Sequence, residues 1–125
     1  MNLCAGLVSF LLCMTDELKI YHWRTRSHAR HQATCQALKE LASLVDTLVE
    51  TYIGRYERPD FPHAHVSLGV RELSEENAAE VVQKYANWMR KRFPEFVHET
   101  DTDLLNIRDE ILGCLDRLSY QFTLS

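Results

Sequence analysis

The sequence predicts an all-α protein, a four-helix bundle with a long crossover between the second and third helices. With 125 residues, the chain is long enough for one domain around a single core. Hydrophobic residues make up 46% of it, with only 4 Gly and 3 Pro, which suits helices joined by few loops. Apolar residues recur at helical spacing in four stretches, and one long stretch without this period separates the second stretch from the third.

The first helix is expected over residues 3–26. Its apolar positions follow the three- and four-residue spacing of one buried face, and they are Leu3, Leu7, Phe10, Leu11, Met14, Leu18 and Tyr21. The apolar run at its start covers about a dozen residues, whereas a bilayer span takes roughly 20. It also lacks the positively charged start of a signal peptide. We therefore expect the buried beginning of a helix and no membrane segment.

The second helix is expected over residues 28–54, with Ser27 as its N-cap and Gly54 at its C-terminal end. Its expected apolar stripe is Cys35, Leu38, Ala42, Val45, Val49 and Tyr52, widened by Leu41, Leu44 and Leu48. A helix that is apolar over this width should contact more than one neighbour.

Residues 55–73 form the expected crossover, because two prolines and Gly69 interrupt any period there, and a short helical turn within it is expected. Ser74 is a cap signal for the third helix, which Pro94 should stop after Phe93. The fourth helix should start near Thr102 or Asp103. Two short connections and one long crossover are typical of a ferritin-like four-helix bundle.

Charge and cysteine content exclude some functions. The formal net charge is −4 and neither end carries a basic tail, so a nucleic-acid partner is disfavoured. No CxxC pair occurs among the four cysteines, which are Cys4, Cys13, Cys35 and Cys114. Free thiols in a reducing cytoplasm are therefore expected.

Residues 19–56 hold the candidate chemistry, in particular His22, His31, Asp46 and Glu50. His31 and Asp46 are roughly 22 Å apart along one helix, so they cannot share a metal within one chain. If two copies of this helix pair antiparallel about a two-fold axis near residues 39–40, His31 lies opposite Asp46 and Glu50 of the other copy. His22 falls at the same end as His31.

A homodimer would thus have two equivalent sites, each with two imidazoles from one subunit and two carboxylates from the other. Asp46 and Glu50 are one helical turn apart, so both can reach one metal. Imidazole with carboxylate suits iron as Fe(II) or Fe(III), and other divalent metals accept the same ligands. The lack of paired cysteines argues against a structural zinc centre.

This segment resembles the signature of the Dps family, the ferritin-like mini-ferritins. The matching pieces are "YHW" at residues 21–23, the second histidine at the start of the second helix, and "LVDTLVE" at residues 44–50. The resemblance implies that His22, His31, Asp46 and Glu50 bind iron at the subunit two-fold. It places Trp23 beside the site. It also implies oxidation of Fe(II) by hydrogen peroxide or oxygen, with ferric mineral stored in a shell of twelve subunits.

The chain departs from the family pattern in three ways. The segment between His22 and His31 is three residues shorter than is usual in the family, so the relative orientation of the two imidazole rings is expected to be affected. Cys35 stands where the family commonly has an aspartate, so this thiol is a candidate to bind metal, to be oxidised or simply to pack. A lysine-rich tail is absent. With its short length, the sequence is similar to a divergent, phage-type branch of the family.

Two other functions remain open from the sequence. A non-catalytic helical homodimer would use the polar cluster for interface specificity, would bind no metal and would tolerate His31→Ala. A thiol-based redox sensor centred on Cys35 would react with peroxide after metal removal.

His28 is expected to face solvent, and His63 and His65 are loop residues or an accessory metal site. The last two helices lack an ExxH pair, so an intrachain di-iron site is not expected.

Overall fold

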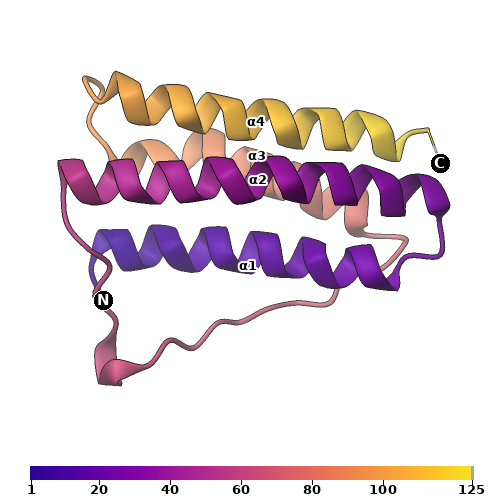
Figure 1. Cartoon of the computed structure of the whole chain (residues 1–125), viewed down its shortest axis with the longest axis horizontal. Helices are drawn as coiled ribbons and strands as arrows, with labels where there is room; N and C mark the ends of the chain where they lie inside the picture. The colour runs from indigo at the N-terminus through magenta and orange to yellow at the C-terminus, as the bar shows by residue number, and fades with distance from the viewer. Residues whose placement is uncertain (125) are drawn as a thin grey trace.

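A computed structural model describes residues 1–124 (Figure 1). Within them the elements are α1 (Leu3–Arg24), α2 (His28–Arg55), η1 (Pro62–Ala64), α3 (Ala78–Lys91), η2 (Phe93–Phe96) and α4 (Thr102–Phe122). The two η elements are single turns of 3₁₀-helix, and the described residues contain no strand. The predicted all-α four-helix bundle is confirmed.

The axes of the four helices are roughly aligned, so that each helix is parallel or antiparallel to the others (Figure 1). α1 and α2 form an antiparallel hairpin, and the crossover then returns along the outside of α1. As a result α3 runs parallel to α2, and α4 runs back antiparallel to both. α2 packs against α1 and α4, and α3 packs against α4. α1 and α3 meet through Phe10 and Trp88, whose rings stack with centroids 3.8 Å apart. The predicted long crossover is therefore present.

The helix ends agree with the sequence signals in part. Ser27 caps α2 as predicted, since its Oγ accepts a hydrogen bond from the Arg30 amide at 3.1 Å. The predicted glycine cap is wrong. Gly54 is helical, α2 continues through Arg55, and none of the glycines in the described residues has positive φ. α1 ends at Arg24, earlier than expected, because Thr25 is already extended.

The start of α3 lies beyond its predicted cap. Residues 75–77 form a turn, and the regular helix begins at Ala78. Ser74 and Asn77 brace this turn reciprocally: the Ser74 amide donates to Asn77 Oδ1 at 2.9 Å, and the Asn77 amide donates to Ser74 Oγ at 3.1 Å. Pro94 lies in η2, just after the end of α3. Ser74 and Pro94 therefore mark the two ends of this segment as predicted, but the regular helix between them, α3, is shorter than predicted.

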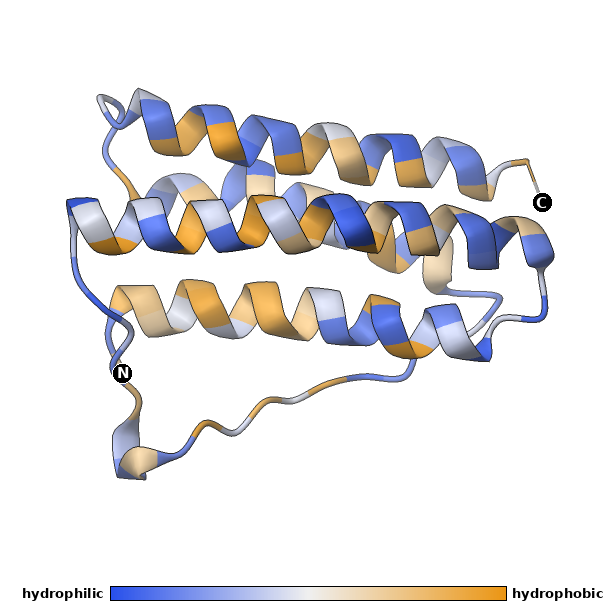
Figure 2. Cartoon of the chain, viewed as in Figure 1, coloured by the Kyte–Doolittle hydropathy of each residue, from blue (hydrophilic) through white to orange (hydrophobic). Residues whose placement is uncertain are grey.

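The core lies between the four helices, and the N-terminal half of α1 is almost continuously apolar (Figure 2). The prediction for α1 is largely correct, with buried side chains at Leu7, Leu11, Met14, Leu18 and Tyr21. Leu3 is exposed and Phe10 is half-buried. Leu3 is the first residue of α1.

The predicted apolar stripe of α2 is wrong in its centre. Of its six members only Tyr52 is buried, and Ala42 is exposed. The buried side chains of α2 are instead Ala33, Thr34, Ala37, Leu41, Leu48 and Tyr52. α2 packs between α1 and α4, so the middle of its buried face is set by those two neighbours. The predicted stripe flanks that face and is largely half-buried.

Glu17 fastens the crossover to the bundle. Its side chain is 2% exposed and accepts hydrogen bonds from the Arg71 amide at 2.9 Å and from Arg71 Nε at 3.1 Å. The Tyr85 hydroxyl donates to its other oxygen at 2.6 Å. One buried carboxylate therefore links α1, α3 and the chain just before α3.

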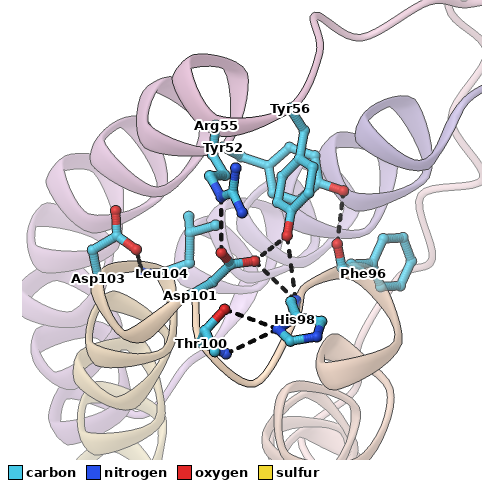
Figure 3. A network of polar contacts seen from close by, with 9 residues as sticks. All are labelled: Tyr52, Arg55, Tyr56, Phe96, His98, Thr100, Asp101, Asp103 and Leu104. Atoms are coloured by element: carbon cyan, nitrogen blue, oxygen red, sulfur yellow. Dashed lines mark hydrogen bonds and ion pairs between the residues drawn. The ribbon is translucent and has the colours of Figure 1, made fainter.

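A second polar network holds the C-terminal end of α2 against the loop that precedes α4 (Figure 3). Asp101 is 3% exposed and accepts from Arg55 Nε at 3.0 Å, from the His98 amide at 2.8 Å and from the Tyr56 hydroxyl. The Tyr52 hydroxyl donates to the Phe96 carbonyl at 2.8 Å. These contacts fix the end of α2 that carries the predicted carboxylate ligands.

None of the described helices combines the length and the apolar composition that a bilayer span requires.

Candidate metal site

The two predicted histidine ligands meet at the turn between α1 and α2. His22 is in the last turn of α1 and His31 is in the first turn of α2, and only residues 25–27 connect the two helices. The imidazole rings stack with centroids 4.0 Å apart and planes inclined by 17°. The structure therefore brings together the pair that the sequence placed at one end of the bundle.

Each ring is held by the backbone of the other residue. His22 Nδ1 lies 3.0 Å from the His31 carbonyl oxygen, and His31 Nδ1 lies 2.9 Å from the His22 carbonyl oxygen. A carbonyl oxygen can only accept, so each Nδ1 must carry the proton. Each Nε2 then presents a lone pair, which is the form in which imidazole binds a metal. Neither Nε2 has a hydrogen-bond partner among residues 1–124.

The two rings differ in their exposure. His22 is 7% exposed, whereas His31 is exposed. Burial lowers the pKa of His22 and the adjacent His31 lowers it further, although the bond to the His31 carbonyl opposes this. His22 is consequently neutral at pH 7, so binding a metal there requires no loss of a proton.

The predicted carboxylate ligands are on α2, as His31 is, but they lie toward the other end of this helix. Asp46 and Glu50 are both exposed, one turn apart in the C-terminal half of α2. Asp46 is roughly 22 Å along the helix from His31. Among the described residues no group of three or more His, Cys, Asp or Glu side chains is close enough to hold a metal. One chain thus separates the imidazoles from the carboxylates.

The fifth predicted ligand, Cys35, lies one turn after His31 on α2. Its side chain is half-buried and its thiol is free, as are the other three thiols. The structure joins Cys35 to neither histidine by a hydrogen bond.

Four histidines remain, of which His98 belongs to the network around Asp101. His28 is exposed, as expected, and its Nε2 is 3.1 Å from Gln32 Nε2. His63 and His65 are exposed in the crossover around η1, and none of these three belongs to a metal-binding group within the described residues.

Comparison with known proteins adds one relationship. A family of unknown function, DUF5856, matches residues 22–122. The chain belongs to this family. The part that matches the family begins at His22 and includes all the predicted ligands. No curated protein and no solved structure matches the chain.

Sequence reasoning missed two polar residues that the structure places prominently. Thr34 is fully buried and touches His22, and Glu17 is the buried anchor of the crossover. Glu17 did carry a signal, because it follows Phe10 by seven residues and Met14 by three and so continues the apolar face of α1. A carboxylate at such a position needs a buried partner. Thr34 also continues an apolar face, four residues before Leu38 and seven before Leu41, but a threonine hydroxyl can bond to the carbonyls of its own helix, so its position did not call for a distant partner.

Proposed function

We propose that the chain is an iron-binding protein that oxidises Fe(II) at two equivalent sites of a symmetric homodimer, with iron storage and detoxification as the outcome. The observation that carries this is the His22–His31 pair, in which both Nδ1 atoms are bonded to carbonyls and both Nε2 atoms are open. Metal-binding histidines characteristically donate their other ring N–H to a carbonyl or carboxylate, which fixes the tautomer and the ring.

A second copy of the chain would bring the carboxylates to this pair. The half-exposed stripe on α2 follows alternating three- and four-residue steps, through Cys35, Leu38, Ala42, Val45 and Val49. This spacing is that of a two-helix seam. The exposed Ala42, with its small side chain, would let two copies of α2 approach closely near the two-fold axis.

The register of such a pair follows from the stripe. Antiparallel pairing that places Leu38 opposite Ala42 of the partner subunit sets His31 opposite Val49 and Glu50 of the partner subunit. Cys35 then lies opposite Val45 and Asp46 of the partner subunit. Each site would therefore combine His22 and His31 with Asp46 and Glu50 of the other chain, and Cys35 would lie at its edge.

The residues suit ferrous iron as a substrate. Neutral imidazole and carboxylate are the donor set of non-haem iron sites, and two carboxylates offset the charge of the bound cation. Hydrogen peroxide takes one electron from each of two ferrous ions, and its O–O bond breaks. With two protons the peroxide becomes two water molecules, and the two iron ions become ferric. Oxygen is the alternative oxidant. The Dps resemblance extends the proposal to storage of ferric mineral in a shell of twelve subunits.

The exposure of one aromatic side chain supports this proposal further. Trp23, next to His22 in the sequence, is 68% exposed in the single chain, and an adjacent subunit would cover this large side chain. We place the activity in the cytoplasm, where the free cysteines remain reduced. The formal net charge of the sequence is −4, so binding to nucleic acid is not proposed.

An anaerobic titration of the metal-free protein with Fe(II), followed by a pulse of hydrogen peroxide, tests the proposal. We expect about one or two Fe(II) per chain and rapid oxidation after the pulse. His31→Ala should abolish both, whereas His28→Ala, which removes an exposed histidine one turn earlier, should retain both. The mass in solution, measured beforehand, should be at least that of a dimer.

Absence of Fe(II) binding by a well-folded wild-type dimer would overturn the proposal. The histidines and carboxylates would then contribute only polarity to a homodimer interface, which is the alternative function. Fe(II) binding that is unchanged in His31→Ala would show that the His22–His31 pair is not the site.

A further inference from the structure

Thr34 is a buried polar residue beside the histidine pair, one turn further along α2. Its side chain is 0% exposed, and its Oγ1 lies 2.9 Å from His22 Nδ1. The same Oγ1 lies 2.8 Å from the Arg30 carbonyl oxygen and 3.1 Å from the His31 carbonyl oxygen. The hydroxyl therefore has hydrogen-bond partners for both its proton and its oxygen within one chain.

The direction of these hydrogen bonds follows from the carbonyls. The hydroxyl has one proton, and the carbonyl of Arg30 is its nearest acceptor. His22 Nδ1 carries a proton because it also faces the His31 carbonyl at 3.0 Å. Thr34 Oγ1 must therefore accept from His22 Nδ1. Two acceptors, one on a side chain and one on the backbone, hold this single N–H.

His31 is held less firmly. Its Nδ1 has one acceptor, the His22 carbonyl at 2.9 Å, and its side chain is exposed. His22 has two acceptors and is buried between α1 and α2. The pair is thus asymmetric, with one ring anchored and one ring able to adjust.

We propose that Thr34 is a positioning residue, which fixes the tautomer and the ring orientation of His22 in the metal-free protein so that Nε2 is preset to bind iron. This inference rests on the proposed function for its metal-binding part. His22 is then the rigid ligand around which the site assembles, and His31 adapts to the bound ion. Loss of a partner that orients a metal-binding histidine typically weakens metal affinity by about 10–100-fold.

The test compares Thr34→Val, which removes the hydroxyl at nearly constant volume, with Thr34→Ser, which retains it. The first measurement is nitrogen-15 NMR of the imidazoles in the full-length, metal-free protein. We expect a single Nδ1–H tautomer for His22 in the wild type and in Thr34→Ser. In Thr34→Val the His22 Nδ1–H signal should shift and exchange faster with water, while the His31 signals serve as an internal reference and change little.

The second measurement is Fe(II) affinity of the same proteins under anaerobic conditions. We expect affinity about 10–100-fold weaker in Thr34→Val and unchanged in Thr34→Ser. If Thr34→Val does not fold, Thr34→Cys replaces it with the same expectation, because a thiol of similar size is a weak acceptor.

The outcomes separate the two proposals. If the wild type binds Fe(II) and Thr34→Val binds it equally tightly with unchanged His22 signals, the proposed function stands and Thr34 has no positioning role. If the wild type binds no Fe(II), the proposed function fails and the metal-binding role of Thr34 fails with it, whatever the NMR signals show.

Discussion

His22 and His31 stack face to face across the α1–α2 turn, and each donates its Nδ1 proton to the backbone carbonyl of the other. The hydrogen bonds that close this turn are therefore also the ones that orient both Nε2 atoms. The short connection between the two helices, residues 25–27, is compatible with this pairing. The segment between His22 and His31, which is shorter than in the Dps pattern, thus does not separate the two rings.

Mixed dimers should show that the iron site is shared between subunits. Asp46→Ala and His22→Ala each disable both sites of a homodimer. After random subunit exchange about half of the dimers contain one chain of each kind, and each such dimer has one intact site, so about one quarter of all sites should recover Fe(II) oxidation.

A mixture of Asp46→Ala with Glu50→Ala is the matched control for this experiment. Both substitutions affect the carboxylate half, so every site in the mixed dimer still contains one damaged residue and no recovery is expected. Recovery in neither mixture, with both variants folded and exchanging subunits, would contradict a shared site.

Peroxide consumption should depend on iron and not on Cys35. Cys35→Ser should still consume peroxide when loaded with Fe(II), because the proposed electron donor is the ferrous ion. The metal-free wild type should consume none. Peroxide consumption by the metal-free wild type that disappears in Cys35→Ser would instead favour the thiol-based redox sensor.

The interface prediction concerns Ala42, at the centre of the half-exposed stripe of α2. Ala42→Glu should weaken self-association by roughly 100-fold or more, because burying an unpaired carboxylate costs several kcal/mol. Analytical ultracentrifugation over a range of concentrations measures this. Ala29→Glu changes another exposed alanine of α2, on a different face of the helix, and should leave the mass unchanged. Equal association of both variants would place the interface elsewhere.

Glu17 should matter for stability. Burial raises the pKa of its carboxyl, but the hydrogen bonds from Arg71 and Tyr85 outweigh burial, so the net pKa is lowered. Glu17→Gln places an amide against Arg71 and should lower the free energy of unfolding by about 1–3 kcal/mol. Urea denaturation measures it.

Glu72→Gln is the control for Glu17→Gln. Glu72 is paired with Arg24, and both of these side chains are more than half exposed. Such pairs contribute about 0–1 kcal/mol. If Glu17→Gln and Glu72→Gln lower the free energy of unfolding equally, the buried position of Glu17 has no special role in stability.

Asp101 should make stability depend on pH in the acid range. The Tyr56 hydroxyl and then the His98 amide hold the pKa of Asp101 at about 2, below its ordinary 3.8, and Arg55 adds to this. The unfolded chain therefore binds the proton more readily, so this stabilisation is present above about pH 4 and is lost as the pH falls toward 2.

Thermal unfolding of Asp101→Asn checks this assignment. Its Tm should lie below that of the wild type at pH 7, and the difference should shrink between pH 4 and pH 2. Asp16→Asn, which changes an exposed carboxylate of α1, should track the wild type throughout. A difference between Asp101→Asn and the wild type that stays constant with pH would refute the assignment.

The amino-acid sequence by itself determined the four helices, the long crossover and the separation of the histidines from the carboxylates. Helical period is a local property, so apolar spacing and caps such as Ser27 sufficed to place the elements. The short turn before His28 put His22 and His31 at one end of the bundle, and helical rise put Asp46 and Glu50 roughly 22 Å away.

Only the tertiary structure decided which face of α2 is buried and how the histidines are held. The apolar face of α2 is wide, and the neighbours that cover part of it, α1 and α4, are set by contacts between residues far apart in the chain. The same holds for Glu17, whose partner Arg71 is 54 residues away, and for Thr34, whose buried hydroxyl contacts the His22 ring only when α1 folds back on α2. Local pattern carries no information about such pairings.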